Sequence, residues 1–183
     1  MKTTAFQLYF PGLTREVLYR MGLELYNKGF FEDSAAWFEQ ATRIRGKYTE
    51  FLPAAYIHLG EIAERKNDGD GYPYFQKALA LLKNRKTKTH VEIYRLASLY
   101  QRLGKRADAY RWFNKLIAGF PLYTLLGGAY FHLGELYLAD RESTRAREMF
   151  DQCLAVLPGH GKAREYLIAL EEEHLNANKE NES

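Results

Sequence analysis

The strings YIHLGEIA (residues 56–63) and YFHLGELY (residues 130–137) are nearly identical, and they decide the fold of this chain. Two weaker copies, LYRMGLEL (18–25) and IYRLASLY (93–100), lie before and between them. The four copies begin at Leu18, Tyr56, Ile93 and Tyr130, which are 38, 37 and 37 positions apart. Self-similarity at such a period predicts an array of like units, each packed on the next.

Each copy is followed by a second repeated string: WFEQAT (37–42), YFQKAL (74–79), WFNKLI (112–117) and MFDQCL (149–154). Apolar residues recur at i, i+3 and i+7 in the first strings, and this spacing places them on one helical face. Each unit therefore predicts a hairpin of two helices. The small residue in each first string, such as Gly60 or Gly134, predicts close approach of a neighbouring helix, because glycine otherwise costs a helix about 1 kcal/mol.

The fourth unit resembles the tetratricopeptide repeat (TPR) family, whose pattern is W-x2-L-G-x2-Y…A-x3-F…P. The matching residues are Tyr130, Leu133, Gly134, Tyr137, Ala146, Phe150 and Pro158, with Tyr in place of Trp. The third unit follows the pattern closely, and the first and second depart further from it. The resemblance covers roughly residues 15–160 and implies an all-α, TPR-like α-solenoid, a right-handed superhelix of antiparallel helix hairpins.

The repeat is longer here than the 34 residues of the family. The surplus lies between the Phe of one unit and the start of the next. Either the second helices are longer, or the linkers carry packed apolar elbows, as Tyr48, Phe51 and Leu52 and residues 122–126 suggest. We expect the extra length to alter the superhelical twist.

Four regions are expected along the chain. Residues 1–14 form an apolar N-terminal segment, and residues 15–161 form the four hairpins. Residues 162–175 form a helix that caps the open end of the array, and residues 176–183 form a polar, disordered tail.

Composition excludes several classes of protein. The net charge of +3 divides into about −4 on residues 171–183 and +7 on the rest, which is too weak a field for a dedicated nucleic-acid binder. The basic stretches 43–47 and 83–90 fit helix C-termini, although an anionic partner is the alternative interpretation. We find no signal peptide and no run of 18 apolar residues, so we expect a cytoplasmic protein without a membrane span.

No catalytic or metal-binding pattern is present. The five His residues have no metal-ligand spacing, and the sequence contains no P-loop, GxGxxG or GxSxG motif. The two HLGE strings, at His58 and His132, suggest a repeated surface position that contacts a ligand. The single cysteine, Cys153, lies in an apolar helical stretch and is expected in the core. We therefore expect no enzyme activity, no cofactor and no metal.

The resemblance also implies a binding surface, because the first helices of TPR proteins line a concave groove that holds peptides. The residues at the matching positions are Tyr19, Leu23, Tyr26, Asn27, Ile57, Glu61, Glu64, Arg65, Tyr94, Ser98, Gln101, Arg102, Phe131, Glu135 and Leu138. They form an aromatic strip of mixed charge. The Lys and Asn with which chaperone-binding members clamp a C-terminal carboxylate are absent, since Tyr19 and Leu23 occupy those positions.

The sequence therefore predicts a protein–protein interaction module or adaptor, which binds a peptide or helical segment of another protein in this groove. One alternative is a structural scaffold that self-associates into a homo-oligomer through its apolar N-terminus or the ends of the array. A secretion or assembly chaperone is a further alternative, although no residue selects it.

Overall fold

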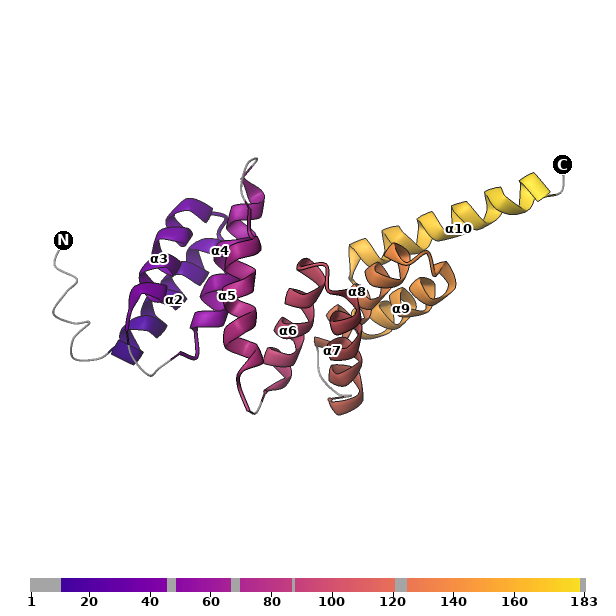
Figure 1. Ribbon diagram of the computed structural model, residues 1–183. Coiled ribbons are helices and arrows are strands. Elements are labelled where there is room, and N and C mark those ends of the chain that lie inside the picture. The colour runs from indigo at the N-terminus through magenta and orange to yellow at the C-terminus, as the bar shows by residue number, and fades with distance from the viewer. Residues whose placement is uncertain (1–10, 46–48, 67–69, 87, 121–124, 182–183) are drawn as a thin grey trace. The chain divides into compact units, whose positions relative to one another are not determined.

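The computed structural model describes residues 11–45, 49–66, 70–86, 88–120 and 125–181 (Figure 1). All regular secondary structure within these residues is α-helical. The chain divides into two compact units, residues 1–86 and 87–183.

The N-terminal unit contains two helical hairpins. Helix α2 (Pro11–Asn27) packs on α3 (Phe31–Arg43), and α4 (Leu52–Arg65) packs on α5 (Tyr72–Lys83). The two hairpins meet where α3 packs on α4. The first two repeats therefore each form a hairpin of two helices, and the first hairpin begins at Pro11, before the expected start at residue 15.

The C-terminal unit contains two further hairpins and a last helix. Helices α6 (His90–Arg102) and α7 (Arg106–Gly119) form the first hairpin, and α8 (Leu125–Ala139) and α9 (Ser143–Val156) form the second. Helix α10 (Gly161–Asn181) packs on α9. Helix α6 begins with a capping box, in which the Thr89 side chain accepts from the Glu92 backbone and Glu92 reaches back to the Thr89 backbone.

A phenylalanine from each second helix fills the core of its hairpin. Phe38, Phe75, Phe113 and Phe150 are all 0–1% exposed. A methyl group added at Gly134 would lie 2.5 Å from the Phe150 ring, and one added at Gly22 would lie 2.8 Å from the Phe38 ring. The small residue in the first helix of a hairpin therefore leaves space for the phenylalanine ring of the second helix, which agrees with the close helix approach that the sequence predicted.

The surplus length of the repeat lies in the linkers. The second helices have only 12 to 14 residues. Phe51, in the linker from α3 to α4, packs on Tyr19 with ring centroids 5.3 Å apart. Leu126, at the start of α8, is buried. Leu52 and Leu125 are half-buried. Phe51 and Leu126 support the packed-elbow interpretation, while the expected elbow residues at 48, 122 and 123 lie outside the described residues.

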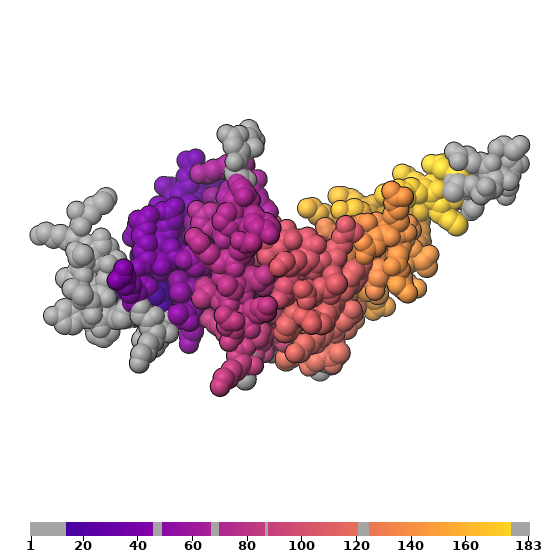
Figure 2. Space-filling view, in the orientation of Figure 1, coloured from indigo at the N-terminus to yellow at the C-terminus, as the bar shows by residue number. Residues whose placement is uncertain are grey.

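Helix α10 covers the end of the last hairpin. Ala163 and Leu170 are buried against it, and the Tyr166 ring stacks on Phe150 at 5.0 Å and 10°. The helix continues to Asn181, and its second half extends beyond α9 (Figures 1 and 2). The expectation of a disordered tail from residue 176 is therefore wrong for residues 176–181, because the polar run continues a helix that is already nucleated on α9.

An arginine that the sequence analysis missed closes the first hairpin. Arg15 is 2% exposed, and its Nε donates to the Ala41 carbonyl at 3.3 Å. Its Nη2 donates to the Ile44 carbonyl. The guanidinium thus satisfies carbonyls at the C-terminal end of α3, where a cation also opposes the helix dipole. Burial lowers the pKa of Arg15, and the charge of Tyr56 acts in the opposite direction.

We expect Arg15→Met to lower the free energy of unfolding by about 1–3 kcal/mol, because it leaves buried carbonyls without donors. Urea unfolding followed by circular dichroism measures this loss. Arg20→Met is the matched control, since Arg20 is exposed on the same helix and forms a surface pair with Glu16. Equal stabilities of the two variants would contradict the role assigned to Arg15.

Candidate functional site

Five residues of the N-terminal unit form a network that we call the N-terminal cluster: Tyr19, Tyr26, Phe38, His58 and Glu61. The Tyr19 hydroxyl lies 3.4 Å from His58 Nε2, and His58 Nδ1 lies 3.0 Å from Glu61 Oε2. The Tyr26 hydroxyl donates to the same Glu61 oxygen at 3.1 Å. The imidazole stacks on Phe38 at 5.1 Å and 15°. The cluster thus joins α2, α3 and α4.

The C-terminal unit repeats this network in Tyr94, Gln101, Phe113, His132 and Glu135, the C-terminal cluster. The Tyr94 hydroxyl lies 3.2 Å from His132 Nε2, and His132 Nδ1 lies 2.9 Å from Glu135 Oε2. Gln101 Nε2 donates to that oxygen at 3.2 Å, in the place of the Tyr26 hydroxyl. The imidazole stacks on Phe113 at 5.5 Å and 19°.

The two HLGE strings therefore supply the same pair of side chains to both units. Each His and Glu comes from the first helix of one hairpin and bonds to the first helix of the hairpin before it. The side chains of His58 and Glu61 are 18% and 23% exposed, and those of His132 and Glu135 are 27% and 31% exposed. The predicted repeated position is thus half-buried, and it joins neighbouring hairpins as well as reaching the surface.

Two members of the predicted aromatic strip are not surface residues. Tyr19 is 6% exposed and packs among Phe38, Phe51 and His58. Phe131 is 7% exposed and packs against Phe150 and His160. Our expectation that these rings are exposed is wrong, because the following linker or helix covers each of them.

The other predicted groove residues keep part of their surface. Asn27, Glu64, Arg65 and Arg102 are exposed. The half-buried members are Leu23, Tyr26, Ile57, Glu61, Tyr94, Ser98, Gln101, Glu135 and Leu138. In the N-terminal unit the Arg65 guanidinium lies over the Phe31 ring at 4.4 Å. We call the members of these two lists in residues 1–86 the N-terminal face, and those in residues 87–183 the C-terminal face. Together they are the first-helix faces.

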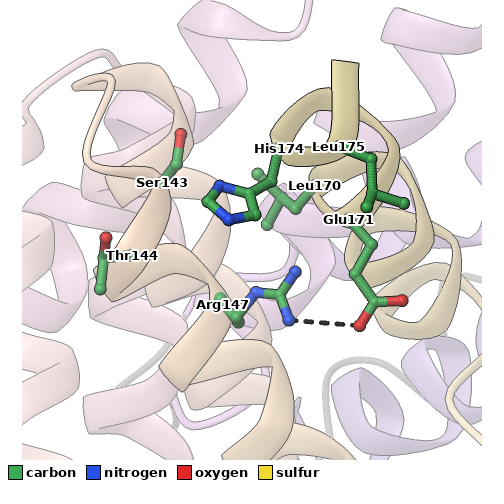
Figure 3. Close-up of a pocket in the computed structure, with 7 residues that line it drawn as sticks. All are labelled: Ser143, Thr144, Arg147, Leu170, Glu171, His174 and Leu175. Atoms are coloured by element: carbon green, nitrogen blue, oxygen red, sulfur yellow. Dashed lines mark hydrogen bonds and ion pairs between the residues drawn. The ribbon is translucent and has the colours of Figure 1, made fainter. Parts of the chain in front are cut away.

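Two surface pockets lie beside the turns inside the hairpins, and one of them shares Arg65 with the N-terminal face. One, of about 410 Å³, lies between the start of α3 and the end of α4, and Phe30, Phe31, Ile62 and Arg65 are among its lining residues. The other, of about 500 Å³, lies between the start of α9 and α10 (Figure 3). Arg147 and Glu171 form an ion pair across it at 3.2 Å, and Leu170 and Leu175 supply its apolar wall (Figure 3).

The start of α7 and the end of α8 are arranged like the start of α3 and the end of α4, but polar side chains bridge them. Arg106 of α7 pairs with Asp140, just after α8, and the Tyr110 hydroxyl donates to the same carboxylate at 3.0 Å. Burial and the Asp140 carboxylate raise the pKa of Tyr110. The sequence analysis missed this bridge, because its members lie 30 or more positions apart and recur in no other repeat.

The described residues contain no group of three or more His, Cys, Asp or Glu arranged to hold a metal ion. Among the described helices, none combines the length and apolar character needed to cross a bilayer. Cys153 is fully buried, as predicted, and burial raises the pKa of its thiol.

Burial tends to raise the pKa of Glu135, but the hydrogen bonds from His132 and Gln101 and the charge of His132 outweigh it, so this pKa lies below its usual range. A carboxylate whose pKa is lower in the folded state stabilises the fold above its unfolded pKa of about 4.3, and this stabilisation is lost as the pH falls through the folded pKa. We therefore expect wild type to be more stable than Glu135→Gln at pH 7, with a difference that shrinks below about pH 4.

Urea titrations of both proteins at several pH values measure this difference. Glu148→Gln is the control, since Glu148 is exposed on α9. A difference between wild type and Glu135→Gln that stays constant from pH 7 to pH 3 would contradict the role of the ionised carboxylate.

The order of the helices defines an α-solenoid class of protein, built from repeated antiparallel hairpins. In the first, second and fourth hairpins, the phenylalanine of the second helix is buried beside the glycine of the first helix. Residues 128–160 match the family model described as tetratricopeptide repeat. The chain is thus a tetratricopeptide-repeat protein in fold, and its best-matched repeat is the fourth hairpin. The predicted all-α, TPR-like fold is confirmed, and the match of the fourth hairpin supports the suspected family.

Solved structures share this fold. The chain is similar to MamA (20% identity, TM-score 0.54, 88% of this chain and 82% of that one). It is also similar to pilF of Pseudomonas aeruginosa (16%, TM-score 0.64, 91% and 72%). A tetratricopeptide repeat protein from Parabacteroides merdae is 24% identical, with a TM-score of 0.56; the match covers 91% of this chain and 62% of that one. A comparison with curated protein sequences found no match.

Proposed function

We propose that this chain is a protein–protein interaction module, and that the first-helix face of each unit binds a peptide or helical segment of a partner. Tetratricopeptide-repeat proteins generally mediate protein–protein interaction or scaffolding. The observation that carries the finer proposal is that one Tyr–His–Glu network occurs in both units. The same atoms are paired in each, and the residues lie on the equivalent helices, α2 and α4 in one unit and α6 and α8 in the other.

The network supports binding because it holds polar groups in fixed positions at a half-exposed surface. Side chains that are already ordered lose little entropy when a partner binds. The C-terminal face places the half-buried Leu138 on the same helix as Glu135. Apolar contact beside oriented polar groups is the usual composition of a peptide-binding surface.

Charged substitutions on each face test the proposal in a pull-down from the native cell. Ser98→Arg and Asn27→Arg place a long side chain on the C-terminal and N-terminal faces. Among the described residues, the Ser98 hydroxyl donates to the Tyr94 carbonyl of its own helix alone, and Asn27 is exposed at the end of α2, so both variants are expected to fold. Gln152→Arg is the control, because Gln152 is an exposed residue of the second helix α9.

We expect the two face variants to lose a captured partner that Gln152→Arg retains. Capture by all three variants at wild-type level would overturn the proposal. We propose no catalytic role for the chain, and a cytoplasmic location stays a prediction. The self-associating scaffold and the secretion or assembly chaperone also stay predictions, since the apolar N-terminal residues 1–10 lie outside the described residues.

A further inference from the structure

The carboxylate of Glu135 is held by one oxygen and open at the other. Oε2 accepts from His132 Nδ1 at 2.9 Å and from Gln101 Nε2 at 3.2 Å. No hydrogen bond from the described residues reaches Oε1. The side chain is 31% exposed, so the second oxygen can meet a ligand without a change in the fold.

The groups that orient this carboxylate are an imidazole and an amide. The Tyr94 hydroxyl lies 3.2 Å from His132 Nε2 and can donate to it, which leaves the imidazole proton on Nδ1 for Glu135. Gln101 is an uncharged amide. Lys162 of α10 attracts Glu135 electrostatically, but no Lys or Arg of the described residues forms an ion pair with it. A half-buried carboxylate that forms no ion pair with a Lys or Arg of the described residues favours a cationic partner, because charge-assisted hydrogen bonds are roughly twice as strong as neutral ones.

We infer that the segment bound by the C-terminal face presents a Lys or Arg side chain to Glu135. This inference rests on the proposed function and names the chemistry of its partner. The N-terminal cluster is the comparison, because Glu61 Oε2 also bonds to His58 and to the Tyr26 hydroxyl, while Arg65 of the same helix already supplies a cation to that face.

Selection from a random dodecapeptide phage library tests this preference without a known partner. The library is selected in parallel on wild type, Glu135→Gln, Glu61→Gln and the control Glu148→Gln. Gln replaces Glu with the same shape and can still accept from His132 or His58, so the clusters keep their packing. Thermal unfolding confirms that each variant is folded at the selection temperature.

We expect peptides selected on wild type and Glu148→Gln to be enriched in Lys and Arg over the input library. The affinity of an enriched peptide is expected to fall about tenfold on Glu135→Gln, the loss of one hydrogen bond to a charged group. The binding should also weaken as salt rises.

Two adverse outcomes are distinguishable. Peptides that lack basic enrichment, or that bind Glu135→Gln as tightly as wild type, would overturn the cationic preference, while the proposed binding function stands if Ser98→Arg abolishes their binding. A wild-type protein that enriches no peptide over a blank surface would instead contradict the binding function itself, and the preference with it.

Discussion

Phe113→Ala is expected to lower the free energy of unfolding of the C-terminal unit by about 3–5 kcal/mol, the largest effect of any single change considered. The Phe113 side chain is 0% exposed in the core of the third hairpin. It stacks on His132 at 5.5 Å and meets the Tyr94 ring edge-on at 6.1 Å. Its loss would therefore leave a cavity and also remove the ring on which the C-terminal cluster rests.

Urea unfolding followed by circular dichroism measures the loss, and Phe30→Ala is the matched control. Phe30 is 56% exposed at the turn between α2 and α3, so its removal deletes little buried surface. A Phe113→Ala protein as stable as Phe30→Ala would contradict the packing described for the second helices.

Gly134→Ala is expected to destabilise the fourth hairpin by about 1–3 kcal/mol, although alanine is the better helix former. The added methyl group would lie 2.5 Å from the Phe150 ring, which is itself 0% exposed. Overpacking therefore outweighs the gain of about 1 kcal/mol in helix propensity.

Gly119→Ala is the control for this second change. Gly119 is the last residue of α7, and nothing lies within 4 Å of a methyl group added there. We expect it to be neutral or slightly stabilising in the same urea titration. If Gly134→Ala is also neutral or stabilising, the glycine does not serve to admit the phenylalanine ring.

Much of this fold follows from local spacing. A small residue in each first helix and a phenylalanine in each second helix recur at a nearly fixed period, and together they specify a hairpin. The structure confirms this at Gly22, Gly60 and Gly134, where a second-helix ring fills the space beside the glycine. The third hairpin carries Ala97, which is buried at this position.

The sites were harder to predict, because their contacts join distant parts of the chain. The HLGE strings mark His58 and His132 as repeated, but their tyrosine partners lie 39 and 38 positions earlier on other helices. The burial of Tyr19 and Phe131 likewise depends on the segment that follows each hairpin. Helix α10 extends to Asn181 because packing on α9 nucleates it, which polar composition alone does not reveal.

Site-specific photo-crosslinking tests the central claim most directly. A benzoylphenylalanine is placed at Leu138 or Asn27 on the first-helix faces, and at Gln152 or Lys77 on the second helices as controls. Irradiation in the native cell is followed by detection of higher-mass products. We predict crosslinks to a partner protein from Leu138 or Asn27 and none from Gln152 or Lys77. Crosslinks confined to the second helices would contradict binding on the first-helix faces.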